Sequence, residues 1–318
     1  MFTTITNRSD YIRACDVNRL PILYNDRFTV NLFGHEVSLN VDPWLHHFHI
    51  KITDVCNAKC DFCIEQNCVK REDPAKALAN IEKMLFEMEK EQCLFSVSVT
   101  GGEPTTFKYF AELCEILNRH EIGFLTMNTN GYGLDKYRDI IDGLFDFVNI
   151  SRHSISDEKN NEIFRTNVLS VKELERIKNR YYSTKFRIQC VIENEIHTVD
   201  DIIAFMDAYS FADDFSFRRL MQTGDEFGLE YVVNNDEYFT ILDHAFNNWT
   251  FKEQAIQDYY VYEIYSYNGK DVTFSYSDMQ MLREIEKTED DAIFREFICH
   301  PDGMISGSWK KDCKIILR

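Results

Sequence analysis

Three cysteines stand close together in the first third of the chain and could bind a metal cluster. Cys56, Cys60 and Cys63 lie in a polar loop, three and two residues apart, directly after a short apolar run. Three thiolates can hold three irons of a four-iron cluster. The fourth iron is then open to a ligand that the protein does not supply. We interpret this loop as an iron–sulfur site whose open iron is the centre of the chemistry.

Zinc is the alternative metal for the same loop. Structural zinc normally takes four ligands, and only Cys68 is near enough in sequence to add a fourth sulfur. Other cysteines, such as Cys93, Cys114 and Cys190, fall in apolar surroundings and are expected to be small buried residues. The ligand count therefore favours the iron–sulfur interpretation.

Strands and helices alternate after the first 46 residues and must position the cysteine loop. Apolar runs predict strands at 47–53, 94–100, 123–128, 147–151, 185–192 and 215–220, with helices between them at 74–88, 109–119, 137–144, 157–164, 171–180 and 200–209. Asp73 and Pro74 are a helix N-cap and first position. Six such units argue for parallel strands with right-handed crossovers, closed or partly closed like a barrel. Polar clusters follow the strands and are expected to converge on one rim.

The flanking segments carry different patterns, so we expect three parts: 1–46, 47–225 and 226–318. Alternation at 28–32 and 36–40 around Gly34 predicts an N-terminal β-hairpin. Residues 226–318 are expected to form an α+β cap over the barrel mouth, with aromatic-rich helices and a terminal hairpin at 297–309 around Pro301, Asp302 and Gly303. The aromatic residues are interpreted as core, or else as a wall that excludes water from a substrate.

Charge and composition limit the partners. The 318 residues include 35 basic and 53 acidic ones, a formal charge of −18, which argues against nucleic acid as a partner. Neither an apolar run of about 18 residues nor a secretory signal is indicated, so we expect no membrane partner and a cytoplasmic location.

The two motifs together resemble the radical S-adenosylmethionine (SAM) enzymes. The resemblance rests on Cys56, Cys60 and Cys63 with Phe62 before the last cysteine, and on Gly101–Gly102–Glu103–Pro104 after the second strand; it covers about residues 47–225. It implies a partial (βα)6 barrel, a [4Fe-4S] cluster, and SAM bound to the open iron. It also implies an electron donor such as flavodoxin or ferredoxin. Reductive cleavage of SAM would give a 5′-deoxyadenosyl radical that abstracts a hydrogen atom from substrate.

The resemblance also implies which residues contact SAM. Gly101 and Gly102 allow close approach of the backbone, and Glu103 is a candidate acceptor for the SAM amino group. Arg152 could pair with the SAM carboxylate. The remaining candidates are polar or aromatic residues at the ends of the other strands or beside the motifs: Phe62, Pro104, Thr129, Asn130, Ser151 and Gln189. Thr129 and Asn130 could equally belong to an ordinary turn with Gly131.

Three further residues are candidates for contact with substrate. His153 follows the fourth strand, where it could point at substrate or be a hydrogen-bonded structural histidine. Arg218 and Arg219 end the sixth strand and would suit a phosphate or carboxylate. This favours a small anionic metabolite. A peptide is the alternative substrate, as in peptide-maturation enzymes, because the N-terminal hairpin could dock a strand.

Within the superfamily, the barrel is most similar to the GTP cyclase lineage of molybdenum-cofactor biosynthesis. The similarity rests on the sixth strand and the segment 221–224 that follows it, and on the polar residues Gln189 and Asn194 on and after the fifth strand. That lineage carries further cysteines for an auxiliary cluster, whereas residues 225–318 hold only Cys299 and Cys313. A second cluster and the cyclase reaction are therefore not expected. A different class of function also stays open: an iron–sulfur redox or sensor protein that does not cleave SAM.

Overall fold

The computed structural model describes residues 3–11, 27–40, 48–60, 62–63, 72–91, 95–193, 195–219, 235–257, 260–277, 293–309 and 314–318. Cys68, Cys93, Asn194, Cys313 and the segment 221–224, on which some predictions depend, lie outside these residues.

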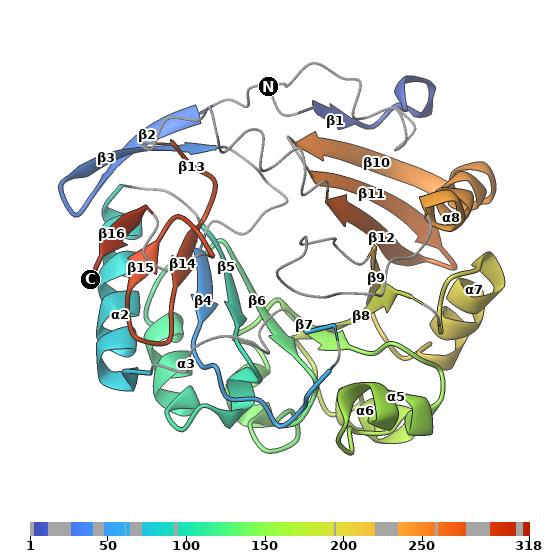
Figure 1. Ribbon diagram of the computed structural model, residues 1–318, viewed down its shortest axis with the longest axis horizontal. Helices are drawn as coiled ribbons and strands as arrows, with labels where there is room; N and C mark the ends of the chain where they lie inside the picture. Colours follow the sequence, from blue (N-terminus) through green and yellow to red (C-terminus); the bar gives the residue numbers. More distant parts are fainter. Residues whose placement is uncertain are drawn as a thin grey trace.

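Six parallel strands form the centre of a large curved sheet (Figure 1). They are β4 (Phe48–Lys51), β5 (Ser96–Thr100), β6 (Phe124–Thr129), β7 (Phe147–Ser151), β8 (Lys185–Ile192) and β9 (Asp214–Arg219), each paired with the next in chain order. The helices between them are α2 (Pro74–Lys90), α3 (Phe110–Asn118), α4 (Arg138–Ile141), α5 (Asp157–Phe164), α6 (Val171–Lys178) and α7 (Val199–Ala208). The predicted partial barrel is confirmed: the helices lie outside a sheet that curves without closing.

Local signals explain where these helices begin. The side chain of Asp73 accepts a hydrogen bond from the Lys76 amide, and Pro74 takes the first helical position of α2. Ser170 and Thr198 form capping boxes at the starts of α6 and α7. The predicted helix at 137–144 is the exception, because only Arg138–Ile141 is helical.

One face of the parallel strands is apolar and packs on the helices. Val97, Val99, Met127, Val148 and Ile150 are buried there, together with apolar side chains of α2, α3 and α7. The intervening strand residues point to the opposite face, because side chains alternate along a strand. The inner face of the curved sheet is therefore built from a different set of residues, many of them polar.

The segment after the sixth strand differs from its prediction. It contains α8 (Asn235–Asn248), but its aromatic residues lie mainly in strands β10 (Thr250–Gln257), β11 (Tyr260–Tyr267) and β12 (Lys270–Ser277) rather than in helices. β12 pairs in parallel with β9, so these strands continue the central sheet, and β1 (Thr3–Ile5) pairs with β10. Trp249, Tyr265, Phe274 and Tyr276 are among its buried aromatic residues, whereas others, such as Tyr260 and Tyr262, are half-buried.

Both predicted hairpins are present. β2 (Arg27–Leu32) and β3 (His35–Asn40) pair around Gly34, and β13 (Ile293–Phe294) adds to β3. Near the C-terminus, β14 (Phe297–Cys299) pairs with β15 (Ile305–Ser306), and β16 (Ile315–Leu317) follows. β14 also pairs with β4, and the Asn80 side chain of α2 donates to the Gly303 carbonyl at 2.7 Å. This hairpin therefore extends the sheet beyond β4; its role as a cap stays a prediction.

Candidate functional site

The cysteine loop begins at the carboxyl end of β4 and is tied to the start of α2. The Glu72 carboxylate accepts hydrogen bonds from the Thr53 hydroxyl at 2.7 Å and the Asp54 amide at 2.8 Å. Farther along, the Lys59 amide donates to the Phe164 carbonyl at the end of α5. Both ends of the stretch before Cys60 are thus held by neighbouring elements.

The glycine turn lies directly against this loop. The Gly102 amide donates to the Thr53 carbonyl at 2.8 Å, and the Glu103 amide donates to the Val55 carbonyl at 2.9 Å. A Cβ atom on Gly102 would lie 2.3 Å from the Val55 oxygen, and one on Gly101, whose φ is +146°, would lie 2.5 Å from the Thr53 oxygen. The glycines are therefore required by the approach of the chain's own backbone, whereas the prediction explained them by the approach of a ligand.

Glu103 is a hub inside the protein. Its carboxylate is fully buried and accepts hydrogen bonds from the Thr105 amide and hydroxyl, the Thr129 hydroxyl and the Asn130 amide, at 2.6–3.1 Å. Burial raises the pKa of this carboxyl above its ordinary value, against the effect of the four donors. Glu103 thus joins the ends of β5 and β6. Its oxygens accept hydrogen bonds from the chain itself, whereas the prediction made them an acceptor for the SAM amino group. Pro104 begins the short 3-10 helix η2 (Pro104–Thr106), for which Glu103 is the N-cap.

Asn130 connects this hub to the first cysteine. Its side-chain amide donates to the Asn57 side chain at 2.7 Å and to the Cys56 sulfur at 4.0 Å. The Ala58 amide donates to the same sulfur at 3.3 Å. Hydrogen-bond donors aimed at a sulfur favour the thiolate, which is the form that binds metal. The predicted ligand Cys56 therefore lies in surroundings that suit a thiolate.

The three cysteines of the loop are half-buried thiols, and the Cys63 amide donates to the Cys60 carbonyl. Within the ranges that the structure describes, no three His, Cys, Asp or Glu side chains are grouped to hold one metal ion. Cys68, the fourth sulfur that zinc would need, lies outside those ranges, so the ligand count of the sequence still carries the iron–sulfur interpretation.

His153 supports the aromatic residue of the loop. The Phe62 ring meets the His153 ring edge-on at 4.9 Å, and Phe164 stacks on the histidine at 5.3 Å. The His153 Nδ1 atom accepts from the Val191 amide at 3.2 Å, so the neutral ring carries its proton on Nε2. Burial, together with the nearby Arg152, lowers the pKa of His153 to about 3. The ring is therefore neutral at physiological pH, which matches the structural interpretation of this residue.

Arg152 is fully buried and holds three backbone segments together. Its guanidinium donates to the carbonyls of Asn130, Ser151 and Leu169 at 2.6–3.0 Å. Burial lowers the pKa of Arg152 to about 10, so the side chain stays charged at neutral pH. These contacts differ from the predicted pairing with the SAM carboxylate, because the donors shown bond to the chain itself.

Arg218 and Arg219 point to opposite faces of the sheet. Arg218 is exposed and shares the inner face with Gln189 and Ser151, which are neighbours in register on β8 and β7. The Arg219 guanidinium lies 5.6 Å from the centre of the Tyr276 ring, on the side packed by α8. Since side chains alternate along a strand, the two arginines cannot both face the barrel mouth, and Arg219 does not join the inner face as predicted.

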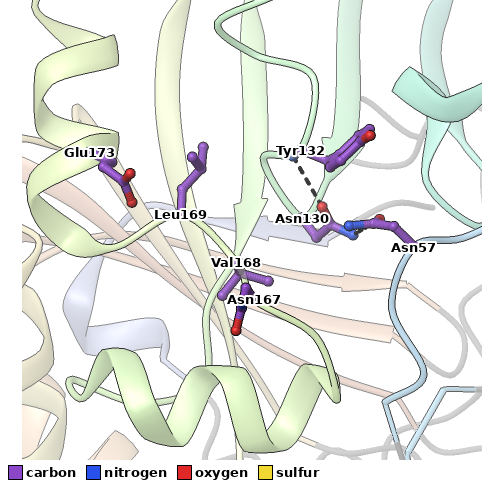
Figure 2. Close-up of a pocket in the computed structure, with 7 residues that line it drawn as sticks. All are labelled: Asn57, Asn130, Tyr132, Asn167, Val168, Leu169 and Glu173. Carbon is purple, nitrogen blue, oxygen red and sulfur yellow. Dashed lines mark hydrogen bonds between the residues drawn. The ribbon is translucent and has the colours of Figure 1, made fainter.

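A pocket of about 270 Å³ opens beside the cysteine loop (Figure 2). It is lined by Asn57, Asn130, Tyr132, Asn167, Val168, Leu169 and Glu173. The Tyr132 amide donates to the Asn130 side chain at 3.1 Å, so the pocket wall is tied to the residue that contacts Cys56. The sequence prediction included Asn130 but missed Asn57, which directly follows the first cysteine.

Sequence reasoning also missed Glu72 and Thr53. Both act at the base of the cysteine loop, and neither belongs to a motif. Glu72 directly precedes Asp73, the N-cap of α2. This position next to a helix start is the sequence signal that could have pointed to Glu72.

Comparison with known proteins identifies the type of domain. Residues 50–206 match the family model described as the Radical SAM superfamily. The chain is 27% identical over 197 residues to a GTP 3′,8-cyclase of Clostridium perfringens, a match that covers 60% of each protein. The chain thus spans about three fifths of the length of this curated relative.

Solved structures share the fold at low sequence identity. SuiB of Streptococcus suis bound to S-adenosylmethionine matches with a TM-score of 0.59 and 15% identity, over 85% of this chain and 62% of SuiB. The same protein has been solved with its precursor peptide SuiA. The protein anSMEcpe with bound AdoMet matches with a TM-score of 0.56 and 16% identity, over 85% of this chain and 76% of the other.

Proposed function

Residues 50–206 are a radical SAM domain, and from that premise we propose that the chain is an enzyme that cleaves SAM reductively and takes a hydrogen atom from a substrate. Its cofactors are a [4Fe-4S] cluster and SAM, and Cys56, Cys60 and Cys63 would hold the cluster. When bound, this pair of cofactors supplies one-electron cleavage of SAM to methionine and a 5′-deoxyadenosyl radical. The electron comes from a donor protein such as flavodoxin or ferredoxin.

The observation that carries the proposal is the convergence on Cys56. Donors from Ala58 and Asn130 approach its sulfur, and Asn130 is fixed by the Glu103 carboxylate of the glycine turn. The two motifs are therefore one connected unit around a thiolate. The match of residues 50–206 to the Radical SAM superfamily favours the enzyme over a redox or sensor protein that does not cleave SAM.

Two buried residues contact this unit: Arg152 donates to the Asn130 carbonyl, and the His153 ring meets the Phe62 ring. Neither residue changes its protonation state near neutral pH, because the pKa of Arg152 is about 10 and that of His153 is about 3. Exclusion of water and of stray hydrogen donors protects a radical. We propose that these residues position the loop rather than take part in hydrogen transfer.

The substrate is proposed to be a small metabolite or a peptide. Arg218 on the inner face would suit an anionic group. The peptide class gains support from a structural relative that is described as bound to its precursor peptide. None of the helices in the described part of the chain is long and apolar enough to cross a membrane.

The experiment is anaerobic reconstitution followed by addition of SAM and dithionite. We expect a brown protein that forms 5′-deoxyadenosine, measured by mass spectrometry. Cys60→Ala should abolish both the four-iron absorbance and the product, whereas Cys114→Ala, in the buried core of α3, should retain both. A wild-type protein with an intact cluster and no 5′-deoxyadenosine above background would favour the redox protein instead.

A further inference from the structure

Five polar side chains stand in register across five neighbouring strands on the inner face of the sheet. Their Cα atoms pair in the order Asn128, Asn149, Arg187, Asp214 and Asp271, on β6, β7, β8, β9 and β12. These strands lie side by side in Figure 1. We call these five residues the inner row. The residues on either side of them along the strands, such as Val148 and Ile150, are buried against the helices, so the inner row faces away from the core.

Asn149 ends a chain of hydrogen bonds and has one atom left over. Its Nδ2 donates to the Asn128 Oδ1 at 3.1 Å, and the Asn128 Nδ2 donates to the Ser98 hydroxyl at 2.9 Å. Asn149 is only 3% exposed, and within the described part of the chain its buried Oδ1 has no hydrogen-bond partner. Buried polar atoms are almost always hydrogen-bonded. The amide oxygen therefore indicates a donor from outside the described residues.

Arg187, directly in register with Asn149, has a hydrogen-bond donor that lacks a partner in the ranges that the structure describes. Its Nη2 atom lies 3.5 Å from an Asp214 oxygen, and its guanidinium stacks over the Phe147 ring at 4.2 Å. The Nε atom is buried and, like the Asn149 oxygen, has no partner among the described residues. Asn149 and Arg187 are register partners on adjacent strands, which lie about 4.8 Å apart. The acceptor without a partner on Asn149 and the donor without a partner on Arg187 therefore come from neighbouring positions of the sheet.

The charges of the inner row favour a neutral ligand. Arg187 is paired with Asp214, and Asp271 is paired with Lys252. Two residues nearer the rim, the next row consists of Ser151, Gln189, Ser216 and Thr273, which are all uncharged hydrogen-bonding side chains. An anion at this place would meet the Asp214 carboxylate. A neutral group with an N–H beside a C=O can donate to the Asn149 oxygen and accept from the Arg187 Nε atom without that repulsion.

We propose that Asn149 and Arg187 form a binding site for an amide group of a neutral, peptide-like substrate. The substrate N–H donates to the Asn149 Oδ1, and its C=O accepts from the Arg187 Nε. Asn149 lies two residues before the end of β7, about 7 Å below the rim that carries the cysteine loop. A substrate held there reaches the rim within one or two residues of its own length. The inference rests on the proposed function and names its substrate class.

The test measures binding without turnover. Reconstituted protein saturated with SAM, without reductant, is titrated calorimetrically with N-acetyl-alanyl-alanine amide, and separately with glutarate and phosphate. We expect saturable binding of the capped dipeptide alone, weakened at least tenfold by Asn149→Leu. Ile150→Val, which alters the opposite face of the same strand, is the matched control and should bind like the wild type.

Unchanged binding in folded Asn149→Leu, absence of dipeptide binding, or preference for either anion overturns the proposal. If Asn149→Leu does not fold, as judged by thermal unfolding, Arg187→Gln takes its place with the same expected loss, and unchanged binding overturns the site. A crystal structure of the dipeptide complex in which water still joins the Asn149 Oδ1 and the Arg187 Nε also overturns it.

Failure of the site and failure of the proposed function are separate results. Wild-type protein that forms 5′-deoxyadenosine with dithionite but binds no dipeptide loses only the amide site. Protein that binds the dipeptide and cleaves no SAM retains the site and loses the proposed radical chemistry.

Discussion

The Glu103 carboxylate accepts a hydrogen bond from the Asn130 amide at 2.7 Å and so joins the ends of β5 and β6. The same Asn130 touches the Cys56 sulfur through its side chain. The acidic residue of the glycine turn therefore acts on the first cysteine through one intermediate residue. Changes at Glu103 are expected to alter the geometry of the cysteine loop even though Glu103 itself contacts no thiol.

We predict that Glu103→Gln destabilises the protein and impairs cluster assembly. A glutamine keeps one acceptor oxygen but places an N–H group against donors such as Thr105 and Asn130. A buried group without a suitable partner costs about 1–3 kcal/mol. The free energy of unfolding, measured with urea, and the iron content should both be lower than in Glu115→Gln, an exposed control on α3. Wild-type stability and iron content in Glu103→Gln would contradict the hub role.

Gly102→Ala should damage the site by a steric route. The added Cβ would lie 2.3 Å from the Val55 oxygen and 3.0 Å from the Cys56 Cβ, so the cysteine loop must move. Such overpacking costs about 1–3 kcal/mol. We expect lower iron incorporation and weaker SAM binding, measured by iron assay and equilibrium dialysis.

Gly34→Ala is the control for this change. Gly34 has a φ of +81° and no atom within 4 Å of an added Cβ, so its alanine variant suffers backbone strain without a clash. It should incorporate iron normally. Equal loss of iron in both variants would show that the effect is general instability rather than displacement of the loop.

Much of the rim could be predicted from sequence because its signals are local. Glycine, proline and capping residues fix where strands end and helices begin, and parallel topology then brings Cys56 and Gly102 to one edge. Which partner a side chain chooses is decided by packing across strands. Arg152 looked available for a carboxylate, yet it donates to the carbonyls of Asn130 and Leu169, which are distant in sequence, and to that of its neighbour Ser151.

The inner face could not be predicted for the same reason. Asn149 and Arg187 are ordinary residues of two apolar strands, and only the register between β7 and β8 places them side by side. The aromatic segment after α8 was predicted as helical, but at the start of β11 the half-buried Tyr260 and Tyr262 alternate with the buried Val261 and Glu263, as in a strand lying on a core. A dense run of tyrosines conceals that period of two.

Arg152→Lys is expected to destabilise the protein by about 1–3 kcal/mol, because an ammonium group cannot replace a planar guanidinium that bonds to three carbonyls. Arg176→Lys, at an exposed ion pair with Asp135, is the matched control and should change little. The measurement is urea unfolding of the protein without its cluster. An Arg152→Lys protein of normal stability that no longer binds SAM would instead favour the direct pairing with the SAM carboxylate.

Glu263 on β11 should make stability depend on pH. The buried carboxylate accepts hydrogen bonds from Tyr11, Gln254 and Tyr265, at 2.6–3.2 Å, and burial raises its pKa to about 7. The unfolded chain loses this proton near pH 4.5, whereas the folded protein keeps it until about pH 7. Stability from this group is therefore present in full below pH 4.5, falls as the pH rises to about 7, and is constant above that value.

The prediction is a difference between two proteins, since many other acids also titrate. In Glu263→Gln the side chain stays neutral at every pH, so the free energy of unfolding of the wild type should fall relative to the variant between pH 4.5 and about 7, by about 3 kcal/mol in all. Urea unfolding at steps of half a pH unit measures this. Glu253→Gln on β10, a residue only partly shielded from water, should show a smaller change. If the free energy of unfolding changes with pH in the same way in wild type and Glu263→Gln, the prediction is wrong. The folded protein would then ionise Glu263 at the same pH as the unfolded chain, with the carboxylate stabilised by the hydroxyls of Tyr11 and Tyr265 and by Gln254.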